Sequence, residues 1–184
     1  DGTTTTRSSP VQVGALTTWA VVSCGQSSSK AIKTDGTLWA WGNNAFGQLG
    51  LNNSTYYSSP VQVGALTTWS FVSAGEYHTS AIKTDGTLWS WGWNNVGQLG
   101  VGNTTIYSSP VQVGALTTWA RVSVGKYFVL ATRNDGTLWA WGEGEYGKLG
   151  QGNTTNYSSP VQVGALTTWL KPSAGYQASF CTQS

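Results

Sequence analysis

Hydrophobic and polar residues alternate along this chain in short runs that recur every 50 residues. Without an insertion or deletion between copies, the segment SSPVQVGALTTW stands at 8–19, 58–69, 108–119 and 158–169. A fixed period of this kind is typical of repeat architectures. No stretch of useful length has the period of an amphipathic helix. We therefore expect one all-β domain over 1–184, with repeats at 1–50, 51–100, 101–150 and 151–184, the last of them incomplete.

Each repeat predicts four short antiparallel strands. One is the VQV run that follows Pro10 and its equivalents, and a proline at the start of a strand is typical of an edge position. The other three in the first repeat are the runs 19–25, 30–34 and 37–41. The last repeat has only the equivalents of the first two of these three runs, and ends before the third.

The Asp-Gly pair at 35–36 predicts a tight hairpin between the last two of these runs. Both turn positions are expected to have a positive φ, which Asp and Gly tolerate. On the returning strand, alternation places Leu38 and Ala40 on one face and Trp39 and Trp41 on the other. Both faces of the sheet are therefore apolar.

Two apolar faces need two covering layers. Sheets that pack radially, face to face, provide them, and this arrangement is a β-propeller. We therefore predict a propeller, or an arc of one, with about four blade equivalents of four antiparallel strands. The chain has 11 tryptophans, and those of the returning strands are expected to fill the space between blades, each burying about 200 Å².

The motifs W-x-x-V-S-x-G, A-I-K-T-D-G-T-L-W-x-W-G and N-x-x-G-Q-L-G resemble the repeat of the regulator of chromosome condensation family over essentially the whole chain. The resemblance implies four-stranded blades, usually seven to a ring. It implies function only weakly, because members include an exchange factor for a small GTPase, ubiquitin-ligase modules and a secreted inhibitor of β-lactamases. The near-identical repeats resemble bacterial, phage and environmental members. With so few blades, the exchange-factor function is not expected.

The ends of the repeat array allow three arrangements. The chain closes alone as a four-bladed ring, with residues 10–14 sealing the last blade. Alternatively, two chains pair into one larger ring, or the chain is an arc that stacks through its open ends by strand addition. Bare sheet edges are a liability, so self-assembly is favoured.

The two cysteines, Cys24 and Cys181, lie in the first and last repeats at positions that hold Ala or Val elsewhere. Both positions are expected to face inward. We predict a disulfide that joins the two ends of the array, within one chain or between neighbours, and hence an oxidising location. The alternative is two buried thiols.

Charged residues make up only 9% of the chain, against about 25% in ordinary soluble proteins. A neutral polar surface of this kind favours an extracellular, secreted, cell-surface or virion protein. The nine cations form no basic stripe, so nucleic acid is not expected as a partner. No run of about 18 apolar residues is present to cross a membrane.

Residues for catalysis are few. The only histidine, His78, falls at a variable repeat position, which predicts a surface or channel-mouth side chain. Asp35, Asp85 and Asp135 belong to hairpin turns, which leaves Glu76, Glu143 and Glu145. Glu143 and Glu145 lie in a Gly-rich loop, where two acids are more often solvated than paired for glycoside hydrolysis. No phosphate loop, nucleophile elbow or metal-spaced cluster occurs. We expect no enzyme activity, no cofactor and no metal.

Variation between the repeats is concentrated at 26–30, 43–46 and 51–57 and their equivalents. Aromatic rings beside amides suit the recognition of proteins or sugars, although drift after duplication explains such variation equally well. The candidate interaction residues are Tyr56, Tyr57, Tyr77, His78, Trp93, Tyr127, Phe128, Tyr146 and Tyr176.

The predicted function is a non-catalytic, extracellular or particle-surface interaction module that self-assembles or presents loops to a protein partner. The alternative is a secreted carbohydrate-binding or protein-inhibitor propeller. Five Asn-x-Ser/Thr sequences would accept glycans in a eukaryotic secreted protein and form only polar turns in a bacterial one; their asparagines are Asn52, Asn53, Asn103, Asn153 and Asn156.

Overall fold

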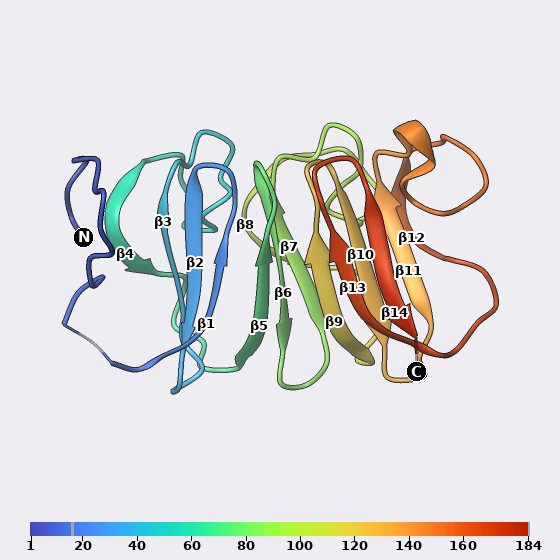
Figure 1. The fold of residues 1–184 in the computed structure, drawn as a ribbon, viewed down its shortest axis with the longest axis horizontal. Coiled ribbons are helices and arrows are strands. Elements are labelled where there is room, and N and C mark those ends of the chain that lie inside the picture. Colours follow the sequence, from blue (N-terminus) through green and yellow to red (C-terminus); the bar gives the residue numbers. More distant parts are fainter. Residues whose placement is uncertain (16, 184) are drawn as a thin grey trace.

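A computed structural model describes residues 1–15 and 17–183, which form a row of antiparallel β-sheets (Figure 1). Blade 1 consists of β1 (Trp19–Cys24), β2 (Ser28–Lys33), β3 (Leu38–Gly42) and β4 (Tyr57–Gln62). Blade 2 consists of β5 (Trp69–Ala74), β6 (His78–Lys83), β7 (Leu88–Gly92) and β8 (Tyr107–Gln112). Blade 3 consists of β9 (Trp119–Val124), β10 (Phe128–Arg133), β11 (Leu138–Gly142) and β12 (Tyr157–Gln162), with a short 3₁₀ helix, η1 (Glu145–Gly147). Blade 4 has only β13 (Trp169–Ala174) and β14 (Ser179–Gln183).

The outermost strand of each complete blade comes from the following repeat. In blade 1 the strand order is β1-β2-β3-β4, and β4 is the SSPVQ segment of the second repeat. Its proline, Pro60, lies on this edge strand, where the missing N–H breaks no ladder bond. The equivalent segment after Pro10 forms no strand. The prediction of a strand at this first copy is wrong, because no LWAWG strand precedes it within the chain.

The Asp-Gly hairpins form as predicted, but a positive φ is found only at the glycine and not at both turn positions. Gly36 has a φ of 78°, whereas Asp35 is not among the described non-glycine residues with positive φ. The Gly36 N–H donates to the Lys33 carbonyl, and the Asp35 carboxylate accepts hydrogen bonds from both the N–H and the hydroxyl of Thr37. The turn is therefore closed by an Asp side chain and a single left-handed glycine.

Neighbouring blades pack through two kinds of face. The forward face of a blade, which contains Ile32 and Leu38 in blade 1, packs on the rear face of the next blade, which contains Val72, Ala81 and Trp91 in blade 2. The same packing recurs between blades 2 and 3 and between blades 3 and 4. The indole N–H of Trp91 donates to the backbone carbonyl of Gln48 across the first of these junctions, at 3.1 Å. The prediction that returning-strand tryptophans fill the space between blades is confirmed for Trp91 and Trp141, both fully buried.

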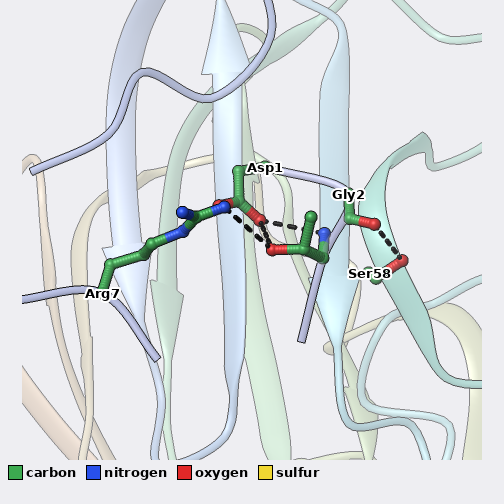
Figure 2. A network of polar contacts seen from close by, with 5 residues as sticks. Asp1, Gly2, Arg7 and Ser58 are labelled. Carbon is green, nitrogen blue, oxygen red and sulfur yellow. Dashed lines mark hydrogen bonds and ion pairs between the residues drawn. The ribbon is translucent and has the colours of Figure 1, made fainter. Parts of the chain in front are cut away.

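The N-terminal segment lies against the outer strand of blade 1 (Figure 2). The Gly2 N–H donates to the Ser58 carbonyl at 3.1 Å, and Arg7 pairs with Asp1 at 3.1 Å. Later in the chain, the Asn52 N–H makes the same bond to the Ser108 carbonyl in the next blade. The segment therefore takes the place of a loop from a preceding blade and does not seal the last one.

The array is open. Blades 1 and 4 lie at opposite ends of the row (Figure 1), so the single four-bladed ring does not form. The disulfide predicted within one chain is absent as well, because Cys24 and Cys181 are free thiols; a bond between neighbouring chains stays a prediction. Cys24 is exposed on the uncovered rear face of blade 1, contrary to the inward position expected for it, whereas Cys181 packs toward blade 3. Among the described residues, no helix is long and apolar enough to span a membrane.

Candidate functional site

All the variable segments meet at one end of the blades. The register pairs Ser28 with Gly42, and Gly42 with Tyr57. The turn before β2 therefore lies beside the long loop between β3 and β4. The same pairing brings the two segments together in blades 2 and 3. The DGT hairpins, which are nearly invariant, lie at the opposite end. We refer to the end with the variable segments as the variable end.

Four glycines stack at the centre of the variable end, one in each turn between the first two strands of a blade. A Cβ atom on Gly25 would lie 2.1 Å from the Gly75 carbonyl oxygen, and one on Gly75 would lie 2.5 Å from that of Gly125. Both distances are shorter than any van der Waals contact. Glycine is therefore required for neighbouring turns to approach this closely, and the next residue of each turn is held around a common axis.

The residues after these glycines line an open cavity of about 450 Å³, and we refer to these four side chains as the axial ring. Each blade contributes a side chain of different chemistry: Gln26, Glu76, Lys126 and Tyr176. An amide, a carboxylate, an ammonium group and a phenol thus occupy equivalent positions. The scaffold repeats, but the chemistry of this ring does not.

Lys126 links three blades within the ring. Its ammonium group lies 3.6 Å from the Glu76 carboxylate of blade 2 and donates to the Tyr176 hydroxyl of blade 4. It also lies over the rings of Tyr127 and Tyr176, at 4.8 and 4.2 Å from their centroids. The hydrogen bond to Tyr176, together with Glu76, raises the pKa of Lys126 above its ordinary value. The Glu76 oxygen that faces Lys126 is buried and has no hydrogen-bond partner within the described part of the chain.

A cluster of four aromatic rings extends outward from the axial ring. Phe46 stacks on Trp93 at a centroid distance of 4.8 Å, and Tyr77 lies 5.1 Å from Phe46 and 5.3 Å from Trp93. Tyr127 continues the cluster at 5.4 Å from Trp93. These four side chains, which come from blades 1, 2 and 3, are half-buried. They form a continuous aromatic surface that no single repeat contains.

Two of the predicted interaction residues are not accessible. His78 and Phe128 are fully buried beneath the turn glycines, so the expected surface position of His78 is wrong. Burial lowers the pKa of His78 to about 3, with a smaller contribution from Lys30, and neither ring nitrogen has a hydrogen-bond partner among the described residues. The imidazole therefore packs as a neutral ring where Phe128 packs in the next blade.

The other predicted residues also lie at the variable end, on its loops except for Tyr57, the first residue of β4, and Tyr146 in η1. Tyr56 and Tyr146 are exposed, and Tyr146 has a φ of 60°, in the left-handed region that disfavours side chains. The Tyr57 hydroxyl accepts a hydrogen bond from the Asn53 side-chain amide at 3.3 Å. The Asn53 side-chain oxygen accepts from the Thr55 N–H at 2.9 Å. This asparagine, one of the Asn-x-Ser/Thr set, therefore stabilises its own loop.

Three residues of the site lie in the variable segments but were not among the predicted interaction residues: Phe46, Glu76 and Lys126. The signal for the last two was the position directly after the turn glycine, which holds a different chemical group in every repeat. Of the acids considered for catalysis, Glu143 forms an ion pair with the buried ammonium group of Lys148, and Glu145 is exposed in η1. Within residues 1–15 and 17–183, no group of His, Cys, Asp and Glu is arranged to hold a metal ion.

Comparison with known families gives a consistent result. The model of the regulator of chromosome condensation (RCC1) repeat matches residues 35–82, 85–132 and 135–182. A second model of the same repeat matches 20–48, 69–98 and 119–148. No curated protein sequence matches the chain.

Solved structures show the same fold. The chain is similar to Prp20p of Saccharomyces cerevisiae, with a TM-score of 0.82 and 21% identity over 91% of this chain and 44% of Prp20p. That structure was described with the binding of Prp20p to Gsp1p and histones. Human WBSCR16 is similar with a TM-score of 0.79 and 21% identity, over 89% of this chain and 44% of that one.

Yeast RCC1 (Prp20) bound to Kap60 is similar with a TM-score of 0.80 and 20% identity, over 90% of this chain and 42% of the matched chain. The present chain thus spans less than half the length of these proteins. At such low identity the similarity concerns the fold alone.

Proposed function

The chain belongs to the RCC1 repeat family, and on that premise we propose that it is a non-catalytic interaction module. It binds a protein partner through the axial ring and the aromatic cluster at the variable end. Self-association through its open blade faces is a second part of the proposal. The low charge of the chain, 9%, supports an extracellular, secreted or particle-surface location.

The aromatic cluster is the observation that carries this proposal. Phe46, Tyr77, Trp93 and Tyr127 form a continuous set of ring contacts across three blades. Large, rigid aromatic side chains lose little conformational entropy when they bind. The neighbouring Lys126 and Glu76 add an oriented pair of charges, which favours one partner orientation over others.

A carbohydrate-binding or protein-inhibitor propeller is the alternative function. Aromatic rings beside polar groups also suit sugars, and the exposed Tyr146 and Tyr176 resemble stacking platforms. The chain can be tested against a phage-displayed random peptide library and against a glycan array. Three variants should be compared with the wild-type chain: W93A, Y127A, and the control L166A, whose exposed leucine lies outside the variable end.

We expect peptides to be enriched on the wild-type chain and on L166A, and lost on W93A and Y127A. Glycan binding with the same dependence on Trp93 and Tyr127 would support the alternative instead. Binding of either ligand that is unchanged by W93A and Y127A would place the interaction elsewhere and contradict the proposed site. Circular dichroism of each variant separates loss of binding from loss of fold.

A further inference from the structure

The junctions between blades share one hydrogen bond in addition to their apolar packing. The Ser23 hydroxyl on the forward face of blade 1 accepts from the Ala74 N–H of blade 2 at 3.0 Å. The equivalent bonds join Ser73 to Val124 at 3.0 Å and Ser123 to Ala174 at 2.9 Å. A serine of one blade is thus paired with a backbone donor located 51 residues later, three times in succession.

Among the described residues, the two ends of the array carry the two halves of one more such junction without a partner. Ser173 on the forward face of blade 4 is the next serine in the series, and the backbone N–H of Cys24 on blade 1 is the corresponding donor. The apolar residues match as well. Phe180, on the forward face of blade 4, is 71% exposed, and Val22, on the rear face of blade 1, is 69% exposed. Side chains at equivalent positions within the array, such as Leu130 and Val72, are buried.

We propose that a second copy of this chain covers these faces, with the forward face of blade 4 seated on the rear face of blade 1 of its neighbour. The inference rests on the self-association in the proposed function and specifies its contact. It is carried by continuity with an established interface, because the same pair of faces already packs together at three junctions. At the proposed contact, Phe180 occupies the position that Leu130 has at the junction of blades 3 and 4. Val22 of the neighbouring copy occupies the position that Val72 has at the junction of blades 1 and 2. Such a contact is heterologous, since it joins two different surfaces.

A heterologous contact allows a test by complementation. V22E places a charge on the rear face of blade 1 and leaves blade 4 intact, whereas F180E does the reverse. Each variant alone is expected to lose the higher-mass species formed by the wild-type chain in sedimentation velocity. In a mixture of the two variants, V22E supplies an intact forward face of blade 4 and F180E supplies an intact rear face of blade 1. The mixture is therefore expected to form a 1:1 pair with twice the chain mass of 19.5 kDa.

The variant L66E is the matched control, because Leu66 is an exposed leucine on a loop outside both faces. It is expected to associate as the wild-type chain does. A wild-type chain that sediments as a single copy at every concentration would overturn both this inference and the proposed self-association. Association that persists in V22E and F180E, or a mixture that forms no pair, would overturn the assigned faces alone. Peptide binding that depends on Trp93 tests the variable end independently of both outcomes.

Discussion

Blades 1 and 2 have nearly the same sequence but different surroundings. Val72 in blade 2 is 2% exposed, whereas its equivalent Val22 in blade 1 is 69% exposed. Trp91 is fully buried, whereas Trp41 is only half-buried. The difference arises because blade 1 packs on the rear face of blade 2 but has no blade behind it. In a repeat array, the energetic role of a residue therefore depends on its place in the array as much as on its sequence context.

The largest effect is expected from truncation of the equivalent tryptophans. W91A removes a buried indole and its hydrogen bond to Gln48, so it should lower the free energy of unfolding by about 3–5 kcal/mol. W41A should cost less than half as much, because its ring faces no neighbouring blade. Urea denaturation of both variants measures the difference. If W91A does not fold, W91F and W41F provide the same comparison. Equal decreases in the free energy of unfolding for the two positions would contradict the expected difference between the blades.

Lys30 lies on the covered side of blade 1, at the position that Leu130 occupies in blade 3. Its ammonium group is fully buried and donates a hydrogen bond to the Ser28 hydroxyl at 2.5 Å, and burial lowers its pKa from 10.5 to about 7. Between pH 7 and pH 10.5, Lys30 is therefore protonated in the unfolded chain and largely deprotonated in the folded chain. The free energy of unfolding should therefore rise as pH increases from about 7 to about 10. Below pH 7 the full cost of burying the charged ammonium group should be present.

Replacement of Lys30 tests this electrostatic penalty. K30L should stabilise the chain by about 2–3 kcal/mol near pH 7 and flatten the rise in stability at higher pH. Urea midpoints measured across this pH range give the result. The control is K171L, because Lys171 is exposed in blade 4, and it should change the free energy of unfolding little. A K30L chain whose stability rises with pH as steeply as that of the wild type would contradict the assignment.

His78 and Phe128 provide a third comparison at equivalent positions. Because the pKa of His78 is about 3 in the folded chain, against an ordinary value of 6.5, the stability that its neutral imidazole contributes is fully present above pH 6.5. It should be lost as pH falls toward 3. H78F should raise the free energy of unfolding by about 1–2 kcal/mol near pH 5. A thermal-unfolding series from neutral to acidic pH measures this effect, and a difference independent of pH would assign it to packing alone.

The smallest effect is expected from the valines. V72A should cost about 1–2 kcal/mol, whereas V22A should stay within about 0.5 kcal/mol of the wild type in dilute solution. At concentrations where copies associate, V22A should also weaken association. Equal costs for the two variants at the lowest concentration would mean that the rear face of blade 1 is already covered.

The sequence predicted the parts of the fold that depend on local pattern. The period, the hairpins and the two faces of the LWAWG strand could all be predicted, because the side chains concerned are fixed within a few residues of each other. His78 could not be placed in the same way. Its position holds Ser, His, Phe or Ala, which suggested a surface site, yet the close stacking of Gly25, Gly75 and Gly125 buries it.

Partner-dependent features were predicted incorrectly for a related reason. The VQV run after Pro10 has the same sequence as the strands β4, β8 and β12, but a strand requires a neighbour to pair with. A disulfide within one chain was expected from the place of Cys24 and Cys181 in the first and last repeats, and an open array keeps these two repeats apart. The aromatic cluster combines Phe46, Tyr77 and Tyr127 from three blades, so only the packing of the blades shows that they meet.

The outer strand has a consequence for how such a chain can change its length. Each complete blade takes its last strand from the following repeat, and the three strands concerned have the same sequence, YSSPVQ. A recombination event that removes or adds 50 residues therefore leaves every internal blade with an outer strand of the correct sequence, wherever the breakpoints fall. The stagger between repeat and blade makes the array tolerant of unequal crossing-over, while the positions around the axial ring remain free to differ in each new copy.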